Sequence, residues 1–134
     1  MKFIKRNKYL AYGSPKITKK EIKEVSEVLK SGWIGTGPKV QEFQVKFAKY
    51  KKVSLAQAVS SCTSAIHLSL LAAKIKKGDE VITSSMTFCA TINAIIHAGG
   101  IPKLIDIDPD TGNIDYKLIE PNITKKTKFI IPVH

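Results

Sequence analysis

From residue 55 onward, short apolar segments alternate with segments of helical periodicity. The apolar segments are typical of buried strands, because they are short and are bounded by turn signals such as Lys77-Gly78-Asp79. Their alternation with helices is typical of an α/β domain with a largely parallel sheet. We therefore predict strands over about residues 56–60, 79–83, 101–106 and 128–133, and intervening helices over about residues 64–75, 87–98 and 114–120.

The first 54 residues carry the signals of two helices. Thr18-Lys19-Lys20-Glu21 has the spacing of a capping box, and the apolar repeat after it predicts a helix over about residues 19–30 that stops at Ser31-Gly32. Gly37-Pro38 suits the start of a second helix, whose apolar stripe is Val40, Phe43, Phe47 and Tyr50. Since no linker or repeat intervenes, we expect a single partial domain over residues 1–134, with a helical segment (1–54) followed by an α/β segment (55–134).

The net charge of +11 invites a nucleic-acid interpretation, but the distribution of charge argues against it. Arg6 is the only arginine, and the lysines are scattered among acidic residues with no aromatic residues interleaved. The apolar runs are too short to span a membrane, and the basic N-terminus lacks the apolar core of a secretion signal. We therefore expect a cytoplasmic protein, and the wide separation of Cys62 and Cys89 supports neither a disulfide nor a metal site.

The segment Ser60-Ser61-Cys62-Thr63-Ser64 lies between the first predicted strand and a helix. The free N–H groups and the positive dipole end of such a helix can hold an anion, so this turn is a candidate phosphate cradle. Small hydroxyl residues are also ordinary helix caps where nothing binds. Phe88 follows the next strand at the same predicted edge, where its ring either packs in the core or stacks on a flat cofactor.

Other motifs favour structural roles. The segment from Asp106 to Gly112 superficially resembles a calcium loop, but the glycine and glutamate required at positions 6 and 12 are replaced by Thr111 and Lys117. A turn followed by a helix cap at Asp115 explains it better. The glycines of residues 32–37 follow a helix rather than a strand, unlike those of a dinucleotide-binding fingerprint.

Several segments, taken in order, resemble the N-terminal third of the DegT/StrS-type aminotransferases, which are pyridoxal-phosphate enzymes that aminate nucleotide-linked keto sugars. The segments are Gly13-Ser14-Pro15, residues 29–38 (LKSGWIGTGP), Ser60 to Ala65, Gly78 to Thr83, Thr87 to Thr91, Asp106-Ile107-Asp108 and Ile131 to His134. The resemblance implies an incomplete α/β fold, namely the N-terminal part of the large domain of a fold type I pyridoxal-phosphate transferase.

Residue by residue, the resemblance implies a cofactor site and a substrate site. Thr63 and Ser64 would bind the phosphate of pyridoxal 5'-phosphate through hydroxyl and backbone N–H groups, and Phe88 would stack on its ring. Cys62 would belong to the same cofactor site, at a position where relatives carry Gly, Ala or Cys. Tyr12 and the loop Gly32, Trp33, Ile34 and Gly35 would reach the nucleotide-sugar substrate. Relatives act as homodimers, so we expect either a second copy or a complementary C-terminal chain as partner.

The family's Schiff-base lysine and the acid that pairs with the pyridinium nitrogen have no counterpart in these 134 residues. We therefore expect no catalytic residue here, no covalent cofactor attachment, and a truncated sugar aminotransferase that is inactive alone. One alternative is a non-catalytic binding subunit that completes its sheet with a partner chain. A more remote alternative is a basic nucleic-acid-binding domain.

Overall fold

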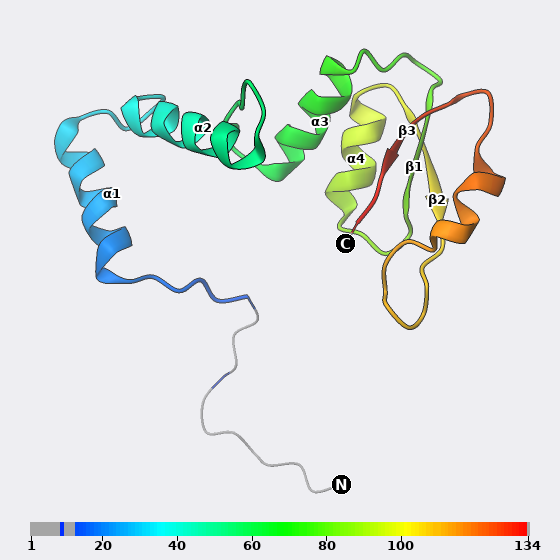
Figure 1. Cartoon of the computed structure of the whole chain (residues 1–134), viewed down its shortest axis with the longest axis horizontal. Coiled ribbons are helices and arrows are strands. Elements are labelled where there is room, and N and C mark those ends of the chain that lie inside the picture. Colours follow the sequence, from blue (N-terminus) through cyan, green and yellow to red (C-terminus); the bar gives the residue numbers. More distant parts are fainter. Residues whose placement is uncertain (1–8, 10–12, 134) are drawn as a thin grey trace, which may run out of the picture. The chain divides into compact units, whose positions relative to one another are not determined.

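The computed structural model describes residue 9 and residues 13–133 of the chain. Contacts divide the chain into two compact units, residues 1–58 and residues 59–134, and each is described by itself. Figure 1 follows the chain through the elements of both units. The expected organisation as one partial domain stays a prediction.

The first unit holds α1 (Lys19–Ser31) and α2 (Pro38–Lys51), as the sequence predicts. The Thr18 N–H donates to the Glu21 carboxylate at 2.7 Å, and the Thr18 hydroxyl accepts from the Lys20 N–H at 3.2 Å. Gly32 ends α1 in the left-handed conformation with φ of 74°, which glycine adopts without strain. The capping box and the terminal glycine therefore fix both ends of α1.

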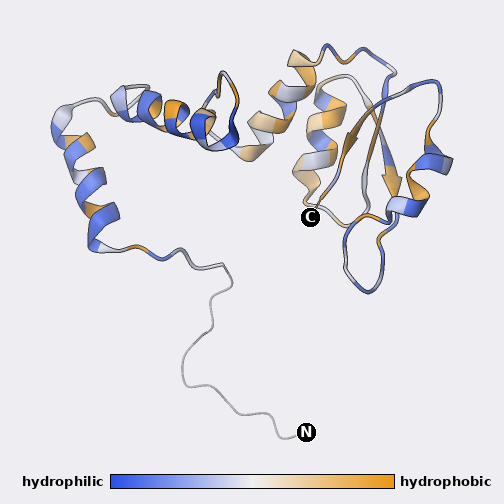
Figure 2. Ribbon diagram, in the orientation of Figure 1, coloured by the Kyte–Doolittle hydropathy of each residue, from blue (hydrophilic) through white to orange (hydrophobic). Residues whose placement is uncertain are grey.

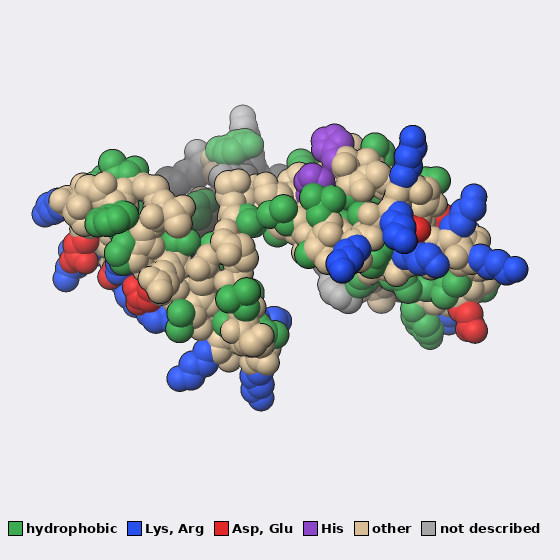
Figure 3. Space-filling view, turned by 90° about the horizontal axis from the view of Figure 1, so that it is seen from above, with side chains coloured by type: hydrophobic (Ala, Val, Ile, Leu, Met, Phe, Trp, Pro, Cys, Tyr) green, Lys and Arg blue, Asp and Glu red, His purple; other side chains and the backbone are tan. Residues whose placement is uncertain are grey.

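The helices of the first unit keep their apolar stripes exposed, and Ala48 is the only buried residue that the structure describes in them. Figure 2 shows these stripes as orange bands on otherwise hydrophilic helices, and Figure 3 shows hydrophobic side chains at the surface. The ring centroids of Phe43 and Phe47 lie 5.7 Å apart, yet both side chains remain half exposed. The predicted stripe of α2 thus exists but has no covering layer within the described part of its unit. No helix in the described residues is both long and apolar enough to cross a membrane.

The second unit is an α/β fragment. Its elements are α3 (Cys62–Ala72), β1 (Glu80–Ser84), α4 (Cys89–His97), β2 (Ile101–Ile105), two short 3-10 turns, η1 (Tyr116–Leu118) and η2 (Glu120–Asn122), and β3 (Thr127–Ile131). The sheet has the order β2-β1-β3, and both strand pairs are parallel. Ser84 lies opposite Ile105, and Thr83 lies opposite Ile131. The predicted parallel α/β architecture is confirmed.

The core of the second unit forms where α3 and α4 pack on one face of the sheet. Leu70, Val81 and Ile95 are its buried centre, contributed by α3, β1 and α4 respectively. Both faces of β1 are covered, because Ile82, which faces the opposite side of the sheet from Val81, is fully buried as well. Burial of these side chains holds both helices in place on the sheet.

Glu80 joins the start of β1 to the segment that leads into β3. Its carboxylate accepts hydrogen bonds from the hydroxyls of Thr124 at 2.6 Å and Thr127 at 3.2 Å. These hydrogen bonds, the one from Thr124 foremost, lower the pKa of Glu80 below its ordinary value of 4.5.

Two sequence predictions were wrong. Residues 56–60 form no strand, because no strand in the described residues pairs with this segment. The predicted helix over residues 114–120 is replaced by η1 and η2. The Asp115 side chain caps η1 as expected, but Pro121 cannot donate a backbone hydrogen bond, so the turns do not join into an α-helix.

Candidate cofactor and substrate sites

The first turn of α3 is built around a capping serine. Ser61 has extended backbone angles, and its hydroxyl accepts from the Ser64 N–H at 3.1 Å. The hydroxyls of Ser61 and Ser64 also lie 3.0 Å apart. Ser61 lies within the phosphate cradle that the sequence predicts, but it was not among the predicted site residues. The sequence signal for its role as N-cap is the three-residue spacing between Ser61 and Ser64, because an N-cap side chain accepts a hydrogen bond from the N–H two or three residues further on.

The cap leaves two backbone donors of this turn available. The N–H groups of Cys62 and Thr63 make no hydrogen bond within the described residues. The Thr63 side chain is exposed beside them, and the Thr63 hydroxyl has no hydrogen-bond partner in the described part of the chain. Two open amides, a hydroxyl and the positive end of a helix dipole form a donor set that fits a phosphate group. Cys62, Thr63 and Ser64 are thus brought together on one turn, although the Ser64 amide is already satisfied.

Phe88 lies at the start of α4, in the loop that follows β1. Ser84, at the end of β1, accepts from the Met86 N–H at 3.2 Å, and the hydroxyls of Thr87 and Thr91 lie 2.8 Å apart. These contacts tie the loop to the sheet and to the first turn of α4. Phe88 is nevertheless 78% exposed, so its ring is not packed in the core that the described residues form.

The chain's path places the starts of α3 and α4 at the same end of the unit. The end of α3 leads directly to the start of β1, so the first turn of α3 lies toward the end where β1 finishes, and α4 begins just beyond that end. Figure 1 shows this arrangement, and the rings of His67 and His97, whose centroids lie 6.4 Å apart, mark the contact between the two helices. In open α/β sheets, ligands bind beyond the carboxyl ends of the strands.

The predicted substrate loop belongs to the first unit, between α1 and α2. Gly32, Trp33, Ile34 and Gly35 follow the end of α1, and the side chains of Trp33 and Ile34 are 61% and 73% exposed. The Ser31 hydroxyl donates to the Val28 carbonyl at 2.7 Å and accepts from the Trp33 N–H at 3.2 Å. Tyr12 lies outside the described residues. The loop is therefore held by local hydrogen bonds and exposes its aromatic side chain.

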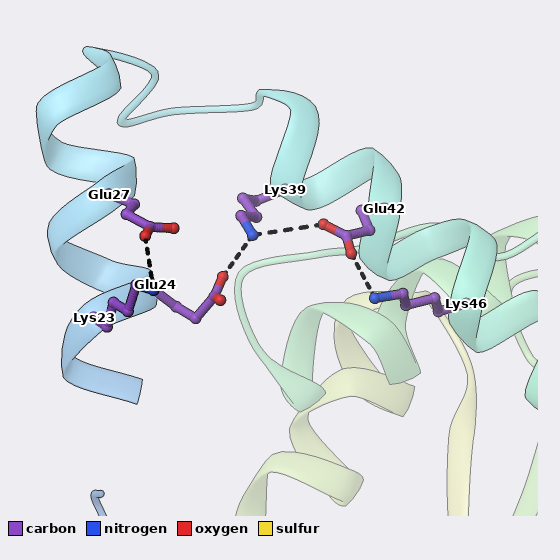
Figure 4. Close-up of polar contacts among 6 residues, drawn as sticks. All are labelled: Lys23, Glu24, Glu27, Lys39, Glu42 and Lys46. Carbon is purple, nitrogen blue, oxygen red and sulfur yellow. Dashed lines mark hydrogen bonds and ion pairs between the residues drawn. The ribbon is translucent and has the colours of Figure 1, made fainter. Parts of the chain in front are cut away.

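An ion pair connects the two helices beside this loop. The Lys39 ammonium group lies 2.5 Å from the Glu24 carboxylate and 3.7 Å from that of Glu42, as Figure 4 shows. The hydrogen bond between Lys39 and Glu24 raises the pKa of Lys39 and lowers the pKa of Glu24. All three side chains are about half exposed, so salt screens this network.

The Asp106–Gly112 segment forms the turn that the sequence predicts. The Asp108 carboxylate accepts from the N–H groups of Asp110 and Thr111 at 2.9 and 3.1 Å, and the Gly112 N–H donates to the Asp108 carbonyl. This carboxylate is therefore engaged in shaping its own loop.

Open amide donors and an exposed aromatic ring beyond the carboxyl ends of a parallel sheet are features that α/β domains use to bind phosphorylated cofactors. The chain belongs to the DegT/DnrJ/EryC1/StrS aminotransferase family, which it matches over residues 15–134. The family and its solved structures support pyridoxal phosphate as the family cofactor.

Three relatives illustrate the likeness. Over 97% of its length the chain is 51% identical to the spore coat polysaccharide biosynthesis protein SpsC of Bacillus subtilis, of which it covers 33%. It is 44% identical, over 96% of its length, to the UDP-4-amino-4-deoxy-L-arabinose–oxoglutarate aminotransferase of Shewanella sediminis, again covering 33%. Spr1654 of Streptococcus pneumoniae in its PMP form superimposes with a TM-score of 0.84 at 41% identity, over 92% of this chain and 31% of that one. The chain thus spans about a third of the length of these relatives and matches their N-terminal part.

Proposed function

We propose that this chain supplies the phosphate-binding and substrate-contacting parts of a pyridoxal-phosphate-dependent nucleotide-sugar aminotransferase. The observation that carries the proposal is the first turn of α3, where Cys62 and Thr63 present open amides next to the Thr63 hydroxyl. Membership of the family and the likeness to a structure solved in the PMP form support it.

In this proposal each part of the site has a separate task. The open amides and the Thr63 hydroxyl bind the cofactor phosphate and orient the cofactor, and the exposed ring of Phe88 covers one face of its pyridine. Pyridoxal phosphate, when bound, supplies an electron-accepting ring that lets an amino group pass between donor and acceptor. Trp33 and its neighbours, with Tyr12, contact the nucleotide sugar.

A backbone substitution tests the cradle directly. Cys62 is the first helical residue of α3, where proline is well tolerated, and the extended Ser61 before it suits a following proline. Cys62→Pro therefore removes one amide donor while keeping the helix, and Cys62→Ala is the matched control that keeps the amide. A hydrogen bond to a charged group contributes about 1.5–3 kcal/mol, so Cys62→Pro should weaken pyridoxal phosphate binding by at least about tenfold.

Calorimetric titration with pyridoxal phosphate measures these affinities. Thr63→Ala should also weaken binding, whereas Ser69→Ala should not, because the Ser69 hydroxyl lies further along α3 and donates to the Ala65 carbonyl. Equal affinities of the Cys62→Pro and Cys62→Ala variants for pyridoxal phosphate would contradict the proposal that the Cys62 amide binds the cofactor phosphate.

We also propose that residues 1–134 alone do not transaminate, because no lysine among them stands in the family's catalytic context. Borohydride reduction in the presence of pyridoxal phosphate, followed by peptide mass mapping, checks this. A stoichiometric adduct on one specific lysine would overturn the proposal of inactivity.

A second candidate function is that of a non-catalytic subunit whose sheet is completed by a partner chain, either a second copy or a complementary chain. The supporting observation is a cleft of about 350 Å³ beside the outer strand β3, lined mainly by apolar residues of α3 and β3 such as Ile66, Leu70 and Phe129. One edge of β3 has no neighbouring strand in the described sheet, and such edges recruit other strands. Analytical ultracentrifugation measures whether the chain associates with a second copy. A stable, monodisperse monomer at high concentration would count against this candidate function.

A further inference from the structure

The side chain of Trp33 lies against Gly37, at the start of α2. A Cβ atom added to Gly37 would lie 3.1 Å from the Trp33 Cβ, 3.3 Å from its Cε3 and 3.5 Å from its Cγ. The Trp33 Cβ cannot swing away like the far end of a flexible side chain, because it is attached directly to the backbone. A Cβ atom at position 37 would therefore require Trp33 to shift by a few tenths of an ångström.

Backbone conformation does not explain the glycine at this position. Gly37 has φ of −144° and ψ of −167°, which is extended backbone that any residue adopts. Gly37 is also the N-cap of α2, where serine, threonine, aspartate or asparagine would add a hydrogen bond that the structure lacks. The close approach of Trp33 is the feature that favours glycine at this position.

Trp33 lines two clefts from this position. One, of about 450 Å³, lies in the corner of α1 and α2 and includes Val28, Pro38 and Val40. The other, of about 470 Å³, includes the polar residues Thr36, Gln41 and Gln44. A displaced indole would change the shape of both clefts.

We propose that Gly37 is a positioning residue, which holds the Trp33 indole in the orientation that receives a ring of the nucleotide sugar. The role of Trp33 in substrate binding rests on the function proposed above. The contact between Gly37 and Trp33 does not depend on that function, because it follows from the interatomic distances alone.

Trp33 is the only tryptophan of the chain, so tryptophan fluorescence reports on the surroundings of this one side chain. Gly37→Ala should change the emission maximum and the acrylamide quenching of Trp33. Gly35→Ala is the matched control, because a Cβ at Gly35 meets no atom within 4 Å. Gly37→Ser adds a capping hydroxyl that supports α2 and should still displace Trp33, so it separates the contact from any loss of the helix.

Titration with UDP-glucose, with UDP as the comparison, measures the consequence for binding. Both Gly37 variants should bind UDP-glucose about two- to tenfold more weakly than wild type, because stacking on an aromatic ring contributes about 0.5–1.5 kcal/mol. If the Gly37 variants lose affinity for UDP-glucose but not for UDP, the ring that stacks on Trp33 is the sugar. If they lose affinity for both ligands equally, the ring is the base. Either result supports the proposal.

Two results would overturn the positioning role. The first is unchanged Trp33 fluorescence in both Gly37 variants, and the second is altered fluorescence with unchanged UDP-glucose affinity. If the wild-type chain binds neither UDP-glucose nor UDP, the substrate role of Trp33 fails. The fluorescence comparison still decides whether Gly37 holds the indole.

Discussion

Truncation of Ile95 tests whether the described core holds α4, and with it Phe88, on the sheet. Ile95 is fully buried against Leu70 and Val81, so Ile95→Ala removes apolar groups worth about 0.8 kcal/mol per carbon and leaves a cavity. Together these effects should lower the free energy of unfolding by about 3–4 kcal/mol. Ile95→Val, which removes a single carbon, should cost about 0.5–1.5 kcal/mol.

The neighbouring Ile96 supplies the control, because its side chain is 53% exposed on the same helix. Ile96→Ala loses little burial and gains helix propensity, so it should change the free energy of unfolding by less than about 1 kcal/mol. Urea unfolding followed by far-UV circular dichroism measures all three variants against wild type. If Ile95→Ala costs no more than Ile96→Ala, α4 does not pack as described, and the placement of Phe88 fails with it.

Three further substitutions test other parts of the structure. Ser61→Ala removes the cap of α3 and should lower stability by about 1 kcal/mol in thermal unfolding, whereas the exposed neighbour Ser60, changed to alanine, should leave stability unchanged. Glu80→Gln should destabilise the chain at neutral pH. The pKa of Glu80 is lowered in the folded state, so its contribution is full above about 4.5 and disappears as the pH falls through the lower folded value. The urea midpoints of wild type and Glu80→Gln should therefore converge on acidification, and a gap that persists at pH 2 would contradict this. Gly100→Ala places a Cβ atom 2.7 Å from the Ile75 Cδ1 and should cost about 1–3 kcal/mol, part of which Ile75→Val should restore.

Elements defined by local chemistry could be predicted from the sequence. The capping box at Thr18 and the glycine at position 32 fix α1 through contacts within a few residues, and the structure reproduces both. The strands β1, β2 and β3 were also predicted, because each is a short apolar run bounded by turn residues. Elements that depend on a distant partner were not predicted correctly. Residues 56–60 have the composition of a strand, but a strand forms only where another strand pairs with it.

The turn at the start of α3 was predicted from the sequence as a segment, but the hydrogen bonds within it were not. Several neighbouring hydroxyl residues could each have capped α3, and only the extended backbone of Ser61 shows which one does. The contact between Trp33 and Gly37 was missed for a related reason. The sequence signal was present, since glycine occupies a cap position that serine would fill better, but recognising it requires the distance to the indole.

The central claim is that the first turn of α3 binds the phosphate of pyridoxal phosphate. Amide chemical shifts measured during titration with pyridoxal phosphate, and separately with pyridoxal, test it most directly. The account predicts that the amides of Cys62 and Thr63 shift most with pyridoxal phosphate and hardly with pyridoxal. The first turn of α1, already capped by Thr18 and Glu21, should stay unchanged. Equal shifts with both compounds, or shifts confined to lysine-rich surfaces away from α3, would contradict it.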